Sequence, residues 1–414
     1  MGDASRLPLE GVRIIDITHD WAGPHATRML ADFGAEVIKI EYVKRMDGMR
    51  GGRLENQLYN RHPRWWEINR NKLSVTLDLH DPHDAEILRD LVKITDVVVD
   101  NSRKGVSDGL GLGYDALVRI KPDIIVLSMT AFGQTGPEAS YAGYGGCIEP
   151  LSGVQSLTGY DHSTRPVRVR EVDVTNGVMG ACAIMTALVH RQQTGRGQAI
   201  DLSQLEATTH ALMGPHLMEH MSSGAQPLPL GNRDARVAPQ GCYRCRGDDR
   251  WVAIAATSDE EWRRLCGAIG RADLVDDARF ASAEARMRHH DELDRVIGAW
   301  TAEREPEAVT RHLQAAGVPA GTVASVEDLS RDPHLEARGF LHRAADDSGR
   351  YPGTPFRLSG ITAGVRMRGP FLGEHNEYVI CQLLGRPKSD VRPVREQDIG
   401  TAFDIEGPAP GAAR

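Results

Sequence analysis

Apolar and polar positions along the first 200 residues follow a repeating order of short strands and helices. Residues 73–79, LSVTLDL, have the two-residue period of a strand, and residues 124–129, IIVLSM, are typical of a buried strand. Residues 24–33 are expected to form a helix that Gly34 ends. Further strands are predicted at 12–17, 37–40 and 97–99, and further helices at 84–93 and 114–120. This β-α-β-α order favours an α/β protein with a parallel sheet covered by helices.

The pattern changes after residue 224. Residues 224–231, GAQPLPLG, have the composition of a linker. Beyond them, strands are predicted at 251–256 and 318–323, with a helix at 259–268. We therefore expect three parts: residues 1–223, a smaller α+β domain at 224–325, and a segment at 326–414 with a helix near 377–384 and a frayed end.

Composition and charge narrow the class of protein. With 414 residues the chain is too long for one ordinary domain, and 41% hydrophobic and 26% charged residues are typical of globular proteins. A formal net charge of −8 argues against general binding of nucleic acid. We find no apolar run near the roughly 20 residues that cross a bilayer. Nor does an apolar signal core follow Met1, so we expect no membrane segment and a cytoplasmic location.

Motifs for several common cofactors are absent or misplaced. Residues 109–113, GLGLG, lack the G-x-G-x-x-G spacing between a strand and a helix, which argues against a dinucleotide fingerprint. The chain has no P-loop and no G-x-S-x-G elbow, and none of its sixteen histidines belongs to an H-E-x-x-H pair. We therefore expect neither a permanently bound cofactor nor a metal site.

The six cysteines are scattered, and we expect free thiols. Cys242 and Cys245 form one C-x-x-C, without the second pair or the nearby histidine pair that a zinc site needs. Two packed structural thiols are the favoured interpretation, and a redox pair is the alternative.

One acidic residue stands just ahead of a helix pattern rich in small apolar residues. Asp173 lies four residues before Gly177, and the predicted helix ends at the TGRG turn, residues 194–197. Free N–H groups at a helix start favour an anion, so this carboxylate is expected to stay ionised, which suits a nucleophile. A plain N-terminal cap is the alternative, since Asp is a preferred cap residue.

Three segments beside predicted strands carry residues that suit a nucleotide-like ligand. After the first strand, Trp21 offers a flat face, Ala22 allows close approach of the backbone, and a helix N-terminus follows. The other two segments are Asn69 to Lys72, before the 73–79 strand, and Asn101 to Lys104, after the 97–99 strand. For each of the three segments the alternative is an ordinary turn or a solvated loop.

Taken together and in this order, these segments resemble the family III CoA-transferases, which include formyl-CoA:oxalate transferases, carnitine CoA-transferases and α-methylacyl-CoA racemases. The resemblance begins at residues 9–41 with LEGVRIIDIT, AGPHAT and LADFGAEVIKIE. It continues with NRNKLSVTLDL at 69–79, AFGQTGP at 131–137, the Asp173 segment, LGNR at 230–233, AAGVPAG at 315–321 and LGEHNE at 372–377.

The resemblance implies a large Rossmann-like domain built from both chain ends, a small domain, and two chains interlocked in a dimer. It also implies that Asp173 is the nucleophile. The residues that it implies for binding coenzyme A are Trp21, Ala22, Tyr42, Asn69, Asn71, Lys72, Asn101, Ser102, Arg103 and Lys104, and those for the acyl or acceptor site are Tyr144, Gly145 and Glu149.

The chain departs from the family pattern in two places. Gly109 stands where members often carry an arginine, so Arg103 or Lys104 is expected to contact the CoA phosphates instead. The acyl-site segment, with Tyr144 and Glu149, differs from that of many members and indicates an unusual substrate. Tyr144 also stands where racemases carry a histidine, and a tyrosine with a reference pKa of about 10 is a poor acid–base group at neutral pH.

We therefore expect a CoA-transferase that moves CoA from an acyl-CoA donor, such as succinyl-CoA, to a carboxylic acid through an aspartyl anhydride and an aspartyl-CoA thioester. Arg165, Arg168 and Arg170 precede Asp173 and are candidates for recruiting carboxylates, with a solvated basic strand as the alternative. There are two alternative functions. The chain is an acyl-CoA racemase, or it is one subunit of a heteromeric transferase for an acid such as an aromatic succinate. The expected partners are the substrates and a second chain, in a homodimer or a heteromer.

Overall fold

The chain forms two compact units, and the computed structural model describes residues 6–160, 167–344 and 349–400. The large unit consists of Met1–Val154, Arg168–Ser222 and Glu336–Arg414, and the small unit of Gln155–Val167 and Ser223–Leu335. Residues 155–167, which the sequence placed in the large domain, group with the small unit. The small unit also extends to Leu335 rather than ending at residue 325.

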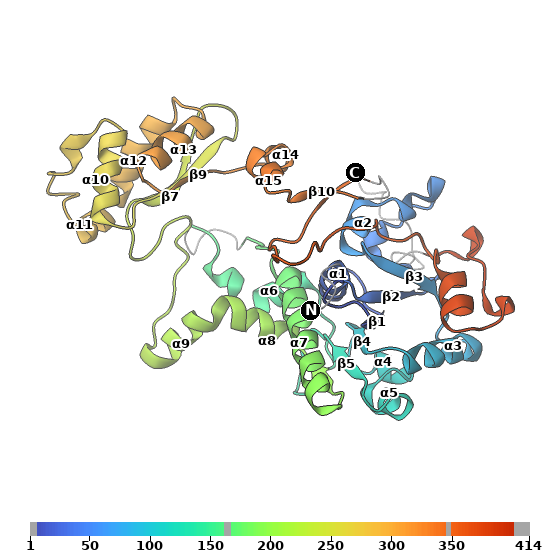
Figure 1. The fold of residues 1–414 in the computed structure, drawn as a ribbon. Helices are drawn as coiled ribbons and strands as arrows, with labels where there is room; N and C mark the ends of the chain where they lie inside the picture. The colour runs from blue at the N-terminus through green and yellow to red at the C-terminus, as the bar shows by residue number, and fades with distance from the viewer. Residues whose placement is uncertain (1–5, 161–166, 345–348, 401–414) are drawn as a thin grey trace, which may run out of the picture. The chain divides into compact units, whose positions relative to one another are not determined.

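A six-stranded sheet forms the centre of the large unit (Figure 1). Its strands stand in the order β3-β2-β1-β4-β5-β6, and every pairing is parallel, which confirms the predicted parallel sheet. The order reverses between β1 and β4, so the connections that follow these two strands lead to opposite faces of the sheet and leave a crevice beyond their carboxyl ends. The strands are β1 (Arg13–Asp16), β2 (Glu36–Glu41), β3 (Lys72–Thr76), β4 (Val97–Asp100), β5 (Ile125–Ser128) and β6 (Ala199–Asp201).

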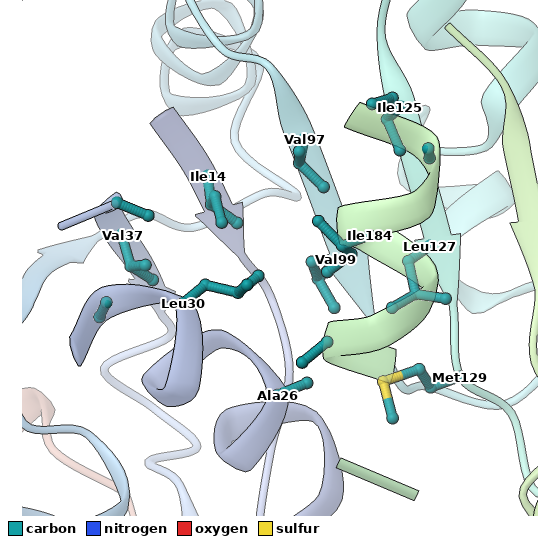
Figure 2. Packing of buried hydrophobic residues seen from close by; sticks show 14 of the residues in the cluster. Ile14, Ala26, Leu30, Val37, Val97, Val99, Ile125, Leu127, Met129 and Ile184 are labelled. Atoms are coloured by element: carbon teal, nitrogen blue, oxygen red, sulfur yellow. The ribbon is translucent and has the colours of Figure 1, made fainter. Parts of the chain in front are cut away.

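Successive residues of each strand contribute to two separate hydrophobic cores. Ile14 packs on one face of the sheet, against α1 and α7 (Figure 2). Ile15 packs on the other face, against α3 and α5. Burial of both faces explains why β4 and β5 are nearly continuous apolar runs. The helices are α1 (Ala22–Asp32), α3 (Pro82–Lys93), α5 (Tyr114–Ile120) and α7 (Val172–Thr194).

Helix α7 is long and apolar enough, by length and composition, to cross a membrane, contrary to the expectation of no such run. A core helix passes the same test, and α7 packs closely on other elements of the large unit. An ideal Cβ at Gly180 would lie 2.9 Å from Met129 Sδ, and one at Gly177 would lie 2.5 Å from His25 Cδ2. The small residues of α7 therefore permit close contact with α1 and the end of β5.

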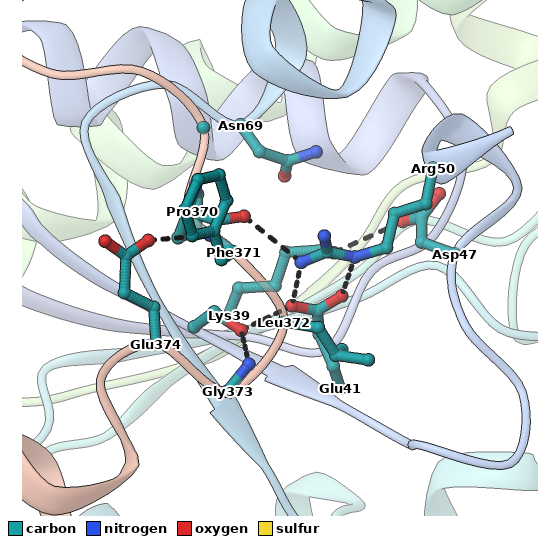
Figure 3. Close-up of polar contacts among 12 residues, drawn as sticks. Lys39, Glu41, Asp47, Arg50, Asn69, Pro370, Phe371, Leu372, Gly373 and Glu374 are labelled. Atoms are coloured by element: carbon teal, nitrogen blue, oxygen red, sulfur yellow. Dashed lines mark hydrogen bonds and ion pairs between the residues drawn. The ribbon is translucent and has the colours of Figure 1, made fainter. Parts of the chain in front are cut away.

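The segment from Glu336 onwards is tied to the first part of the large unit by contacts between residues about 300 positions apart. The Asn376 side chain donates to Thr76 Oγ1 and accepts from the Thr76 N–H, each at 2.8 Å. Arg50 donates to the Pro370 carbonyl at 3.3 Å (Figure 3). The helix predicted near 377–384 is a π-helical turn, η6 (Tyr378–Leu383), whose buried residues join the second core.

Shorter elements complete the large unit. Strands β10 (Leu341–Arg343) and β11 (Arg350–Pro352) pair antiparallel. The remaining helices are α2 (Pro63–Ile68), α4 (Val106–Gly109), α6 (Gly145–Leu151) and α8 (Gln204–Thr208), while α9 (Gly214–Ser223) and α15 (Pro333–Ala337) lie where the chain passes between the units.

The small unit is built around an antiparallel sheet of order β7-β8-β9. Trp262 and Leu293 pack on this sheet in one core, and Cys245 and Cys266 are buried in it as free thiols. The strands are β7 (Gln240–Arg244), β8 (Trp251–Ala255) and β9 (Ala320–Thr322), and the helices are α10 (Asp259–Ala268), α11 (Ala283–Arg288), α12 (His290–Thr301), α13 (Pro306–Ala315) and α14 (Val326–Ser330).

Candidate active site

A cavity of about 510 Å³ opens beyond the carboxyl ends of β1 to β4, where the reversal of strand order leaves room. Each of these strands contributes the loop that follows it, and the segment before α6 closes one side. The lining residues lie within 17–22, 40–45, 77–80, 101–110 and 142–145, together with Asp173 and Gln204.

Asp173 enters this cavity from the first turn of α7. The helix begins at Val172 and its N-cap residue is Glu171, so Asp173 lies inside the helix and is not its cap. An ideal Cβ at Gly145 would stand 2.9 Å from Asp173 Oδ2. Glycine at position 145 therefore leaves the space next to the carboxylate open, as a nucleophile requires.

The electrostatic surroundings of Asp173 differ from the sequence expectation. Burial raises the pKa of Asp173, and the Asp20 carboxylate raises it further, while the charge of Arg168 opposes both effects. The pKa of Asp20 is itself raised by burial and by Asp47. Two acidic side chains thus line one cavity, and the Asp20 charge disfavours the charged form of Asp173.

The loops after β1 and β4 are fastened together at the point where the strand order reverses. The Asn101 side chain accepts from the His19 N–H and donates to the His19 carbonyl, each at 2.8 Å. This pair of hydrogen bonds fixes the backbone that carries Asp20 and Trp21. Of the residues predicted to bind CoA, Trp21, Ala22, Tyr42, Asn101, Ser102 and Arg103 line the cavity.

Asn69, Asn71 and Lys72, which the resemblance implies for binding CoA, do not line this cavity. All three are buried and lie outside the cavity lining, because they stand at the amino end of β3. Lys72 Nζ donates to Asp16 Oδ2 at 2.8 Å and to Asn69 Oδ1 at 2.9 Å, and burial lowers its pKa to about 8. Asn71 donates to Asp32 and accepts from the Arg366 N–H. Most of these polar groups satisfy one another inside the fold, but Asn69 Nδ2 is buried without a hydrogen-bond partner.

Of the remaining residues predicted for the site, some line the cavity and others lie outside its lining. Tyr144 and Gly145 line the cavity, and the Tyr144 side chain is exposed. Glu149 is fully buried outside the lining and accepts a hydrogen bond from Arg168 Nε at 2.8 Å. Lys104 is exposed and also lies outside the lining. Arg165 falls outside the described residues, and the Arg170 side chain is exposed.

Sequence reasoning missed the contribution of the segment after β3. Leu77, Leu79 and His80 line the cavity, as do Arg45 after β2 and Asp20 after β1. The position of these segments relative to the strands could have predicted this, because ligands bind beyond the carboxyl ends of parallel strands. Residues 77–80 follow the predicted strand's paired part, whereas residues 69–72 precede the strand. Among the described residues, no group of three His, Cys, Asp or Glu side chains is placed to hold a metal ion.

Comparison with known proteins gives a consistent result. The sequence profile described as CoA-transferase family III matches residues 9–376. The chain is 35% identical to the succinyl-CoA–D-citramalate CoA-transferase of Chloroflexus aurantiacus over 389 residues, covering 93% of this chain and 96% of that protein. It is 33% identical to the succinate–glutarate CoA-transferase of Agrobacterium fabrum over 391 residues, covering 91% of this chain and 96% of the relative.

A solved structure agrees with the sequence matches. The crystal structure of a CaiB/BaiF family protein from Brucella suis superimposes with a TM-score of 0.83 at 30% identity, covering 92% of this chain and 100% of that one. Profile, relatives and structure each extend over nearly the whole chain. The chain therefore belongs to CoA-transferase family III, the CaiB/BaiF proteins, and is a CoA-transferase that acts on acyl-CoA substrates.

Proposed function

We propose that this enzyme transfers CoA from succinyl-CoA to a carboxylic acid, with Asp173 as the covalent nucleophile. The observation that carries the proposal is the Asp173 carboxylate, which lines the cavity with open space at Gly145 beside it. The names of the relatives from Chloroflexus and Agrobacterium supply the donor class, since one names succinyl-CoA and the other succinate. Citramalate and glutarate, the other acids in those names, are both dicarboxylic.

The first half-reaction moves CoA onto the enzyme. A carboxylate oxygen of Asp173 attacks the thioester carbonyl carbon, the C–S bond breaks, and CoA thiolate leaves as a mixed anhydride forms. The thiolate then attacks the Asp173 carbonyl carbon of the anhydride. Succinate departs as a carboxylate, and an aspartyl-CoA thioester remains, so no proton, water or ATP is consumed.

The second half-reaction runs the same steps in reverse with another acid. The acceptor carboxylate attacks the aspartyl thioester, and CoA thiolate leaves from a new anhydride. Attack of the thiolate on the acceptor carbonyl regenerates the Asp173 carboxylate and releases the new acyl-CoA. Water hydrolyses both the anhydride and the thioester, so the Asp173 side chain must be shielded from solvent. Its partial burial supports this.

The walls of the cavity suit the CoA substrate. Leu77 and Leu79 supply an apolar surface beyond β3, and Trp21 offers an aromatic face. Arg45 and Arg103 supply cations for the phosphates. We assign phosphate binding to these two arginines rather than to Lys72, whose ammonium group is enclosed by Asp16, Pro24 and Asn69.

The pH dependence of transfer tests the state of Asp173. Because the residue reacts as a carboxylate, kcat/KM is expected to fall as the pH drops through its raised pKa, at a higher pH than for an aspartate with the ordinary value of 3.8. Asp20→Asn removes a nearby charge that raises this pKa, so the acidic limb should move to lower pH. Steady-state rates between pH 4 and 8 measure both.

Asn at position 20 is a conservative choice, because Asp20 has a φ of 63° and Asn adopts this backbone conformation readily. An acidic limb that stays in place in the Asp20→Asn variant, with kcat/KM at pH 8 retained, would contradict the electrostatic coupling between the two side chains.

A matrix of donors and acceptors tests the function itself. The purified enzyme is mixed with succinyl-CoA, acetyl-CoA or butanoyl-CoA and a panel of mono- and dicarboxylic acids, and new acyl-CoA is read by mass spectrometry. Succinyl-CoA with a dicarboxylic acceptor should give the highest kcat/KM. Uptake of solvent deuterium at the α-carbon without any acceptor acid would instead indicate a racemase.

Two further relatives are the beta and alpha subunits of the succinyl-CoA–L-malate CoA-transferase of Chloroflexus aurantiacus, at 30% and 31% identity. Their names support a heteromer with a related chain as the alternative to a homodimer. Purification of the tagged chain from its own host decides between them, since a heteromer retains a second family III chain in fixed proportion.

A further inference from the structure

Gln204 is a buried amide residue in the lining of the candidate active site. It is the first residue of α8, and only 7% of its surface is exposed. Its backbone N–H donates to the Thr130 carbonyl at 3.0 Å, and its backbone carbonyl accepts from Thr208 Oγ1 at 2.7 Å. Because both backbone groups are bound inside the fold, the side chain is the part of Gln204 that can serve a ligand in the cavity.

The Met129 carbonyl fixes which way the Gln204 amide faces. Gln204 Nε2 donates to the Met129 oxygen at 2.9 Å, and a carbonyl can only accept, so the nitrogen end of the amide lies there. Among the described residues, the second N–H of Nε2 and the Oε1 atom have no hydrogen-bond partner. Asn101, the other amide side chain of the lining, differs because both of its ends bind the His19 backbone. Gln204 therefore has an oriented donor to offer a substrate.

Three hydrogen bonds connect Gln204 to the first turn of α7, which carries Asp173. Asn176 Nδ2 donates to the Val172 carbonyl at 2.8 Å and to Thr208 Oγ1 at 3.1 Å. Thr208 Oγ1 in turn donates to the Gln204 carbonyl at 2.7 Å. Laid end to end, these bonds limit the distance between the carbonyl oxygens of Val172 and Gln204 to about 9 Å. The Val172 carbonyl belongs to the peptide that leads into Asp173, so neighbouring backbone carries both side chains to one cavity.

We propose that Gln204 is a second catalytic residue, whose remaining Nε2 N–H donates a hydrogen bond to the carbonyl oxygen of the acyl-CoA thioester. The inference rests on the proposed function, because this oxygen gains a negative charge only when Asp173 attacks the thioester carbon. As the new C–O bond forms, the electron pair of the C=O bond moves onto the oxygen, and the hydrogen bond strengthens. The pair returns when the C–S bond breaks and CoA thiolate leaves. Gln204 keeps its proton throughout.

The charges around the cavity make a neutral donor suitable here. Asp20 and Asp173 both line the cavity, and negative neighbours disfavour a further negative charge on the thioester oxygen. An N–H aimed at that oxygen offsets this effect, and the bond to Met129 holds the amide in place before the reaction begins. The amide carries no net charge, so it forms no ion pair that would reduce the reactivity of the Asp173 carboxylate.

Gln204→Met tests the role in the reaction, because methionine has nearly the same length and no hydrogen-bond donor. With succinyl-CoA as donor, kcat should fall by about 100-fold while KM changes by less than about threefold, since the hydrogen bond strengthens in the transition state. Gln193→Met is the matched control, because Gln193 is an exposed amide of α7 outside the cavity lining. This control should keep both constants. An unchanged kcat in Gln204→Met would overturn the proposal.

Binding of two CoA derivatives separates this proposal from the proposed function. Asp173→Asn and Asp173→Asn/Gln204→Met are titrated calorimetrically with butanoyl-CoA and with S-butyl-CoA, in which two hydrogens replace the carbonyl oxygen. Loss of Gln204 should weaken butanoyl-CoA by about 3- to 10-fold and S-butyl-CoA by less than about twofold. An equal effect on both ligands, or none on either, would overturn the hydrogen bond to the carbonyl oxygen. A selective effect on butanoyl-CoA in an enzyme whose Asp173 is never acylated would support that bond and overturn the proposed function.

Discussion

Replacing Asp173 by Asn is expected to reduce CoA transfer by at least about 1000-fold, or roughly 4 kcal/mol of transition-state stabilisation, while the protein stays folded. The amide has the shape of the carboxylate but cannot form the anhydride. The pKa of Asp173 is raised, which means that the folded state disfavours its charge. A protein loses the stability that such an acid contributes as the pH rises through the raised pKa. At neutral pH the Asp173→Asn variant, which carries no charge at this position, should therefore unfold at the same temperature as the wild type or higher.

The comparison uses transfer rates with saturating succinyl-CoA and thermal unfolding of the same samples. Asp115→Asn is the matched control, because Asp115 is also an acid in the first turn of a helix, α5, but is exposed and outside the cavity lining. It should keep its activity. An Asp173→Asn variant that retains more than a tenth of the wild-type rate would exclude covalent catalysis at this residue.

The largest effect on stability is expected at Arg50. Its side chain is fully buried and donates to both Glu41 carboxylate oxygens at 2.7 Å, as Figure 3 shows. The guanidinium also donates to Asn60 Oδ1 and lies 3.6 Å from the centre of the Trp65 ring. Arg50→Met leaves the Glu41 charge buried without its cation, and the large unit should lose about 3–5 kcal/mol of unfolding free energy.

Urea unfolding of the wild type and of Arg50→Met measures this difference in unfolding free energy. Removing both charges in Arg50→Met/Glu41→Leu should restore most of the loss, because a buried apolar pair avoids the uncompensated charge. Arg331→Met, which breaks an exposed pair with Glu327, should leave the urea midpoint unchanged. If the double variant is as unstable as Arg50→Met, the cost arises from packing and not from the isolated carboxylate.

The sequence predicts the parallel sheet well because local pattern and burial agree there. The helix at Tyr114–Ile120 and the helix at Asp259–Ala268 match their predictions residue for residue. In the second of these, Ser258 accepts from the Glu261 N–H and fixes the helix start. The strands differ by one to three residues at their ends, since the apolar pattern continues past the last paired residue.

Long-range contacts explain most of what sequence reasoning missed. Nothing local in residues 69–72 shows that Lys72 meets Asp16 or that Asn71 meets Asp32, because those partners are 56 and 39 positions away. The grouping of residues 155–167 with the small unit is equally non-local. The raised pKa of Asp173 comes from burial and from the charge of Asp20, and only the folded sheet brings these two side chains to the same cavity.

The most direct test of the account is to identify the enzyme atom that becomes acylated. The enzyme is mixed with succinyl-CoA in the absence of acceptor, treated with hydroxylamine, and mapped by peptide mass spectrometry. A hydroxamate is expected on Asp173, formed from its CoA thioester or anhydride and absent from Asp173→Asn. Turnover of succinyl-CoA with a hydroxamate on another side chain, or with no modified residue at all, would contradict it.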